Sequence, residues 1–106
     1  MDGYNYNRKI YAILGEPELL AQLAEEAAEL AQAALKLRRA LDGSNPTPIS
    51  TNRCREALAE EYTDVATCAS ILKIKYNPKM ADFKCRRWLN RLGVQLNRME
   101  DHNGRD

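Results

Sequence analysis

The fold is decided by the stretch QLAEEAAELAQAALKL, residues 22–37, which crowds Glu25, Glu26 and Glu29 onto little more than one helical turn. No Lys or Arg follows within four residues of any of the three. Like charges three or four residues apart destabilise a helix by roughly 0.2–0.5 kcal/mol per pair. Helix formation alone therefore does not explain this acidic stretch.

The composition of the whole chain sets the class of protein. Of 106 residues, 44% are hydrophobic and 29% charged, and the net charge is +1, as in an ordinary globular protein with one small domain. The sequence has no apolar run of about eighteen residues and no secretory leader, so we expect neither a membrane partner nor export. The expected location is cytoplasmic.

Apolar residues around the opening stretch recur every three or four positions, which predicts a long amphipathic helix. The series is Leu20, Leu23, Ala27, Leu30, Ala34, Leu37 and Leu41. Pro17 marks the start of this helix and Asp42-Gly43 its end. Residues 4–14 predict a shorter helix before it.

The stretch DGSNPTPIST, residues 42–51, is rich in turn formers and predicts a loop. A second helix is expected from about Asn52 to Tyr76, and a third from about Met80 towards Leu96. No strand pattern is visible. We therefore predict a single all-α domain over residues 1–97 and a polar tail over residues 98–106.

The cysteines and the histidine exclude several kinds of site. Cys54, Cys68 and Cys85 are odd in number and widely spaced, which argues against a disulfide framework or a zinc site. His102 is the single histidine and lies in the polar tail. A nucleophile activated by histidine is therefore not expected.

The second predicted helix repeats the crowding of acids. Glu61 follows Leu58 by three residues and precedes Val65 by four, so it lies inside the apolar stripe, where a carboxylate is costly unless paired. Asp64 lies one turn further on. If the two long helices pack antiparallel, Glu26, Glu29, Glu61 and Asp64 converge. Clustered carboxylates without His or Cys favour Mg²⁺ or Mn²⁺, whereas for Glu25 and Glu60 a solvated acidic face is an equal alternative.

At these residues the sequence resembles a known family. Glu26-Ala-Ala-Glu29 followed by Glu61-Tyr-Thr-Asp64 resembles the ExxE and ExxD pair of the MazG-like, all-α nucleoside triphosphate pyrophosphohydrolases. That superfamily includes dimeric dUTPases, dCTPases and phosphoribosyl-ATP pyrophosphohydrolases. The resemblance covers roughly residues 10–92, although the 31 residues between Glu29 and Glu61 form a longer gap than is usual there.

The resemblance implies a helical bundle completed by oligomerisation, as a homodimer or homotetramer. It also implies a Mg²⁺-dependent hydrolase that converts a nucleoside triphosphate to the monophosphate and pyrophosphate. Glu26, Glu29, Glu61 and Asp64 would bind metal, and Glu25 or Glu60 would act as the base. The resemblance extends to Gln22 and to the basic residues Lys84, Arg87 and Arg91, which would bind substrate. For the three basic residues a solvated basic face is an equal alternative.

Two other classes of function stay open. The apolar series from Leu20 to Leu41 also fits the seam of a non-enzymatic helical interaction module. The basic residues around Trp88 are compatible with nucleic-acid binding, but the nearly balanced net charge and the lack of a reading motif argue against it.

Overall fold

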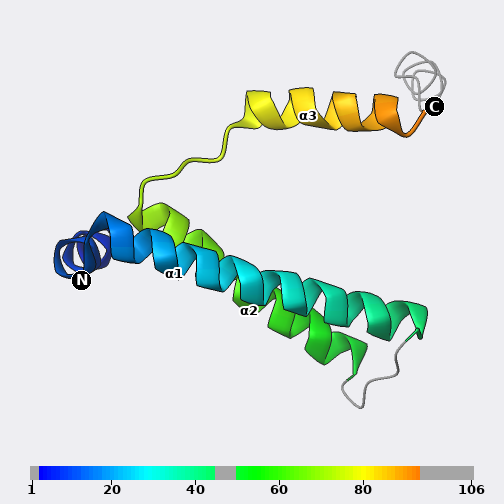
Figure 1. Cartoon of the computed structure of the whole chain (residues 1–106), viewed down its shortest axis with the longest axis horizontal. Helices are drawn as coiled ribbons and strands as arrows, with labels where there is room; N and C mark the ends of the chain where they lie inside the picture. Colours follow the sequence, from blue (N-terminus) through cyan, green and yellow to red (C-terminus); the bar gives the residue numbers. More distant parts are fainter. Residues whose placement is uncertain (1–2, 45–49, 94–106) are drawn as a thin grey trace. The chain divides into compact units, whose positions relative to one another are not determined.

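The computed structural model describes residues 3–44 and 50–93, and within them it contains three helices and no strand. The helices are α1 (Gly3–Asp42), α2 (Thr51–Ile71) and α3 (Pro78–Arg91), drawn in Figure 1. The prediction of an all-α chain is confirmed.

The chain divides into two compact units, Met1–Lys75 with α1 and α2, and Tyr76–Asp106 with α3. That residues 1–97 act as one domain stays a prediction, and the polar tail predicted for residues 98–106 lies outside the described residues.

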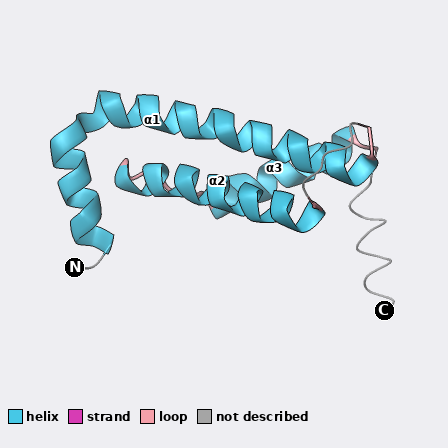
Figure 2. Ribbon diagram, turned by 90° about the horizontal axis from the view of Figure 1, so that it is seen from below, coloured by secondary structure: helices cyan, strands magenta, loops and turns pink. Residues whose placement is uncertain are grey.

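Helix α1 is two helical segments joined at Gly15, as the sequence predicted for residues 4–14 and the stretch after Pro17. Gly15 has φ 79° and ψ 166°, a backbone conformation that essentially only glycine adopts. The chain turns sharply there, and Figure 2 shows the N-terminal arm, residues 3–14, bent away from the long segment. Pro17 follows in the first turn of that segment, where its missing N–H costs nothing.

The long segment of α1 and the whole of α2 run side by side as an antiparallel hairpin (Figures 1 and 2). Helix α2 begins close to its predicted start, because the hydroxyl of Ser50 accepts a hydrogen bond from the backbone N–H of Arg53 at 3.2 Å. This N-cap satisfies one of the donors left free at the helix start.

The predicted end of α2 at Tyr76 is wrong, because the helix stops at Ile71. Lys73 adopts a left-handed φ of 61°. The N–H groups of Lys73 and Ile74 donate to the carbonyls of Ser70 and Ala69 at 3.0 and 2.9 Å. These are the two bonds of a Schellman motif, with lysine in the place usually taken by glycine.

Helix α3 begins two residues earlier than predicted. Asn77 caps it by accepting a hydrogen bond from the N–H of Met80 at 3.0 Å, and Pro78 takes the first helical position. The pair Asn77-Pro78 thus starts α3 instead of ending α2. Large apolar side chains of α3, including Phe83 and Trp88, are exposed, and Leu96 lies outside the described residues.

The buried stripe of α1 differs from the predicted one at alternate positions. Leu23, Leu30 and Leu37 are at least half-buried as expected, but Leu20 and Leu41 are 47% and 56% exposed. The residues that complete the stripe are Leu19, Glu26 and Ala33. Leu19 is the most buried, at 1% exposed. Because alanines lie on several sides of α1, apolar spacing alone cannot distinguish the predicted stripe from the observed one.

Within the described ranges, none of the helices combines the length and apolar character needed to cross a bilayer.

Replacing Gly15 by alanine tests the bend in α1. The added Cβ meets only Cδ of Pro17, at 4.0 Å, so the cost arises from the backbone conformation and not from a clash. We expect Gly15→Ala to lower the free energy of unfolding by about 1–3 kcal/mol in urea titrations. Gly43→Ala, at an ordinary helix-ending φ of 70° with open space around it, is the control and should cost less. Equal costs would show that the bend imposes no special strain.

Candidate metal centre

The candidate site lies in the seam between α1 and α2, where Glu26 and Glu61 occupy positions that apolar residues hold in the neighbouring turns. Both side chains are half-buried. The Oε2 atom of each is inaccessible to solvent and has no hydrogen-bond partner within the part of the chain that the structure describes. A buried carboxylate oxygen without a partner is costly, which distinguishes these two atoms from those of ordinary surface acids.

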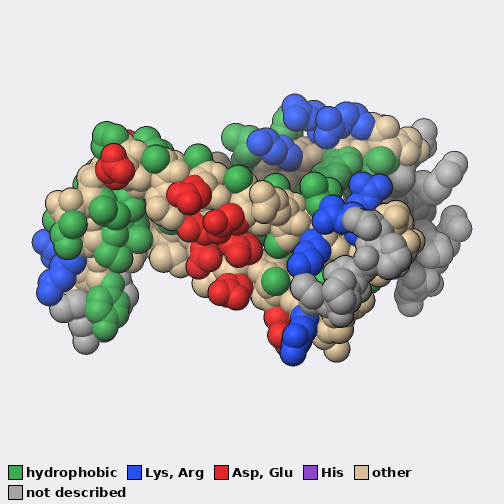
Figure 3. All heavy atoms as spheres, turned by 60° about the horizontal axis from the view of Figure 1, so that its bottom comes forward, with side chains coloured by type: hydrophobic (Ala, Val, Ile, Leu, Met, Phe, Trp, Pro, Cys, Tyr) green, Lys and Arg blue, Asp and Glu red, His purple; other side chains and the backbone are tan. Residues whose placement is uncertain are grey.

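Glu29 joins them from the next turn of α1. Carboxylate oxygens of Glu26, Glu29 and Glu61, one from each, all lie within 4.8 Å of one another. The i, i+3 spacing places Glu26 and Glu29 on one face of α1, and the antiparallel packing of α2 brings Glu61 to them. Figure 3 shows the acidic side chains gathered in one red patch on this hairpin. We call Glu26, Glu29 and Glu61 the carboxylate cluster.

The charges of the neighbouring acids act on Glu29. The pKa of Glu29 is raised above its ordinary value, first by the charge of Glu26 and next by that of Glu61. The described residues form two ion pairs, Arg38 with Asp42 and Arg86 with Asp82, and neither includes a cluster residue. The cluster thus concentrates negative charge without a basic side chain paired to it in the residues described.

Gln22 fixes the orientation of one cluster residue. Its side-chain Nε2 donates a hydrogen bond to Oε1 of Glu26 at 2.8 Å. This bond leaves Oε2 of Glu26 as the oxygen without a partner among the described residues. Contact of Gln22 with substrate, expected from its position ahead of the first motif, stays a prediction.

Asp64 is half-buried on α2 but does not belong to the group of three. It lies near Cys68, whose thiol pKa is raised first by burial and then by the charges of Glu26 and Asp64. The thiol therefore stays protonated at neutral pH. The spacing of four residues between Asp64 and Cys68 on the same helix accounts for the position of this thiol beside the acid.

The remaining predicted residues lie outside the cluster. Glu25 and Glu60 are exposed and point to no partner that the structure records, so their assignment as the catalytic base stays a prediction. Lys84, Arg87 and Arg91 are exposed on α3, in the second unit. The guanidinium of Arg87 lies over the ring of Phe83, 5.9 Å from its centre.

The donor set fits a hard divalent cation. The cluster offers carboxylate oxygens from two helices, and two of these oxygens are buried without a partner among the described residues. Oxygen-only sites of this kind suit Mg²⁺ or Mn²⁺ better than softer metals. Comparison with protein-family models, curated proteins and solved structures finds no match for the chain.

The repulsion within the cluster predicts how stability depends on pH without metal. Because the pKa of Glu29 is raised in the folded state, the folded protein binds this proton more tightly than the unfolded chain does. The contribution of Glu29 to the free energy of unfolding therefore falls as pH rises through the folded-state pKa. In chelator, we expect Glu29→Gln to gain stability over wild type at pH 7, and the gain to vanish as pH falls towards 4.5.

Urea titrations of both proteins between pH 4.5 and 7 check this, with Glu18→Gln, an exposed acid of α1 outside the cluster, as the control. A difference between wild type and Glu29→Gln that does not change with pH would contradict the expectation.

Proposed function

We propose that this protein is a Mg²⁺-dependent nucleoside triphosphate pyrophosphohydrolase of the MazG-like kind. The observation that carries the proposal is the carboxylate cluster, in which Oε2 of Glu26 and Oε2 of Glu61 are buried without partners among the described residues. Its members stand at the ExxE and ExxD positions of the sequence resemblance. A functional ligand explains why both helices accept acids in their packed seam.

The chemistry of the substrate agrees with the charge of the site. A triphosphate and a carboxylate cluster repel each other, so neither binds the other directly. A bound divalent ion supplies the charge that joins carboxylates to phosphates and lowers the pKa of its water. Glu26, Glu29 and Glu61 would hold it, with Asp64 one turn further along α2.

The remaining roles rest on the sequence. A water oxygen bonds to the α-phosphorus, the bond from that phosphorus to the α–β bridging oxygen breaks, and pyrophosphate leaves. Glu25 or Glu60 would take the proton of the water at a carboxylate oxygen. Gln22 keeps Glu26 in place through its hydrogen bond. The resemblance implies that Lys84, Arg87 and Arg91 of α3 hold the outgoing pyrophosphate.

A homo-oligomer is part of the proposal, supported by the apolar face that the hairpin leaves exposed. Leu20 and Leu41 are 47% and 56% exposed, and on the long segment of α1 they fall in one seven-residue series with Ala27 and Ala34. Such a series lies along one side of a helix and suits packing against another helix. A second copy of the hairpin would complete a four-helix bundle around it.

The first test is pyrophosphate release from a panel of canonical and modified nucleoside triphosphates, with Mg²⁺ and with chelator. We expect Mg²⁺-dependent release by wild type, a loss of about 100-fold or more in Glu61→Gln, and unchanged helicity by circular dichroism. Glu18→Gln, an exposed acid of the same hairpin, should keep full activity.

Retained turnover in Glu61→Gln would refute its ligand role. The panel includes dUTP, dCTP and phosphoribosyl-ATP, so the ranking separates the activities of the superfamily. No release from any of them would refute the enzyme and favour the helical interaction module, for which the exposed Phe83 and Trp88 of α3 are an additional surface.

Sedimentation tests the oligomer. We expect wild type to show a mass above the 12.1 kDa of one chain. Leu20→Glu should reduce that mass towards the monomer, because it places a charge on the face to be buried. Glu18→Gln again serves as the control. A wild-type monomer with full activity would contradict the oligomer.

A further inference from the structure

Helix α3 has an apolar side that no other helix of its own unit covers within the described residues. Residues three, four or seven positions apart share one side of a helix. Trp88 and Leu92 on this side are 60% and 65% exposed, and α3 is the one helix that the structure describes between residues 76 and 93. The residues that we call the apolar side of α3 are Ala81, Cys85, Trp88, Leu89 and Leu92.

The rest of α3 is strongly basic. Its five basic residues, all exposed, are Lys79, Lys84, Arg86, Arg87 and Arg91. Asp82 is the one acid of the helix and pairs with Arg86 at 3.1 Å. Phe83 also belongs to the basic side, where the guanidinium of Arg87 lies 5.9 Å from the centre of its ring. Five basic residues against one acid leave α3 with an excess of four positive charges.

Basic residues border the apolar side of α3 along both of its edges. Lys84 precedes Trp88 by four residues and Arg91 follows it by three. On the other edge, Arg86 precedes Leu89 by three residues. Long basic side chains in such places keep their charge in a polar layer while the apolar residues beside them enter a nonpolar one.

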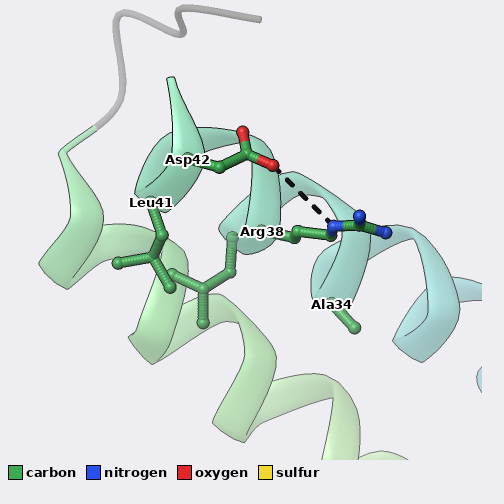
Figure 4. A pocket seen from close by; sticks show the side chains of 5 residues that line it. Ala34, Arg38, Leu41 and Asp42 are labelled. Atoms are coloured by element: carbon green, nitrogen blue, oxygen red, sulfur yellow. Dashed lines mark ion pairs between the residues drawn. The ribbon is translucent and has the colours of Figure 1, made fainter. Parts of the chain in front are cut away.

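The exposed apolar face of α1 has no such excess of positive charge at its end. Figure 4 shows the hollow there, of about 510 Å³, which Leu41 lines together with Arg38 and Asp42. The guanidinium of Arg38 pairs with the carboxylate of Asp42 at 3.8 Å, so the charge of this hollow is balanced. A balanced apolar face suits contact with another helix, whereas α3 suits a partner that is both apolar and negatively charged.

A second copy of the hairpin presents these two properties apart along the middle of α1. Glu25 and Glu29 lie two residues before and after Ala27, which belongs to the exposed apolar series. Residues two apart do not face the same side of a helix, so these acids point away from that series. An anionic lipid bilayer instead has negatively charged headgroups directly above an apolar layer.

We propose that α3 binds the surface of an anionic lipid bilayer, with its apolar side in the outer part of the lipid and its basic side chains against the headgroups. The 14 residues of α3 give a helix of about 21 Å, which lies flat in the interface. Such a helix does not cross the bilayer. The expectation of no membrane partner rested on the lack of a spanning segment, so it does not cover this case.

The experiment uses Trp88, the single tryptophan of the chain, as a reporter placed in α3. The full chain is titrated in chelator with vesicles of phosphatidylcholine alone, and with vesicles of phosphatidylcholine and phosphatidylserine in equal parts. We expect a saturable blue shift of the Trp88 emission with the anionic vesicles only, and weaker binding as salt is raised. No shift, or an equal shift with both kinds of vesicle, would overturn the proposal.

A variant of the apolar side tests its entry into the lipid. Leu92→Glu places an acid on this side and should remove the blue shift, with helicity by circular dichroism unchanged. Ile13→Glu makes the same kind of change at an exposed aliphatic residue of the N-terminal arm and should bind as wild type does. Equal losses in the two variants would contradict a role for α3.

Two charge variants test the basic side with residues that have no part in the proposed hydrolase. Lys79→Gln and Arg86→Gln should each weaken binding to the anionic vesicles about fivefold. Lys9→Gln removes an exposed cation of the N-terminal arm and should have no effect. The same weakening in all three variants would show general charge attraction and overturn the assignment to α3.

Other occupants of α3 give different results. An emission that shifts to the blue with protein concentration, and does not change with vesicles, would show that a second copy covers the apolar side. Tighter binding to double-stranded DNA or RNA than to the anionic vesicles would assign the basic side to nucleic acid. Either result would overturn the proposal.

Glu61→Gln should bind the anionic vesicles as wild type does. The outcome for α3 is therefore independent of whether the carboxylate cluster supports nucleotide hydrolysis.

Discussion

The approach of Glu26 to Glu61 across the seam between α1 and α2 is the constraint on which the rest of the hairpin depends. Both side chains stand where the neighbouring turns carry apolar residues, and their Oε2 atoms are buried without partners among the described residues. Two apolar residues in these places would remove the repulsion and add buried area. The sequence instead keeps acids there and adds Glu29 beside them, which makes the hairpin less stable than its length allows.

The small core makes this cost more serious. Among the described hydrophobic residues, those classed as fully buried are Leu19, Leu37, Cys54, Cys68 and Ile71. Two packed helices can bury only one stripe each, so the exposed series through Leu20 and Leu41 on the long segment of α1 remains available to a further helix. A domain of this size commonly gains stability from association. Cation binding at the carboxylate cluster would reduce the repulsion, and packing of another helix on the exposed side of α1 would add buried apolar area. Each would thus compensate for the small core.

Sequence patterns predicted most of the fold because they are local. The break in α1 before Pro17 and the start of α2 carry glycine, proline or a capping residue, which act on their own neighbours. The end of α2 was not predicted, because Lys73 takes the left-handed conformation at a position where the sequence has no glycine. The buried register of α1 was also missed, because alanines at residues 27 and 34 satisfy the spacing as well as Glu26 and Ala33 do.

The candidate site, like the fold, was predictable in part from the sequence. The convergence of Glu26, Glu29 and Glu61 follows from helical spacing and antiparallel packing, and the structure contains it. The separate position of Asp64 depends on the rotation of α2 about its axis, which a spacing of three residues does not define. The contact of residue 7 with residue 70 was not predictable, because it depends on the direction in which the chain bends at Gly15, which the sequence does not define.

One geometric variable connects the carboxylate cluster to the contact between the N-terminal arm and α2. The register of α1 against α2 sets both the approach of Glu26 to Glu61 and the hydrogen bond from Asn7 to Ser70, which lies nine residues beyond Glu61. A slip of one turn, about 5.4 Å, would separate both pairs at once. The arm hydrogen bond therefore helps to maintain the register in which the carboxylates repel each other, and a cation among them would reinforce the same register.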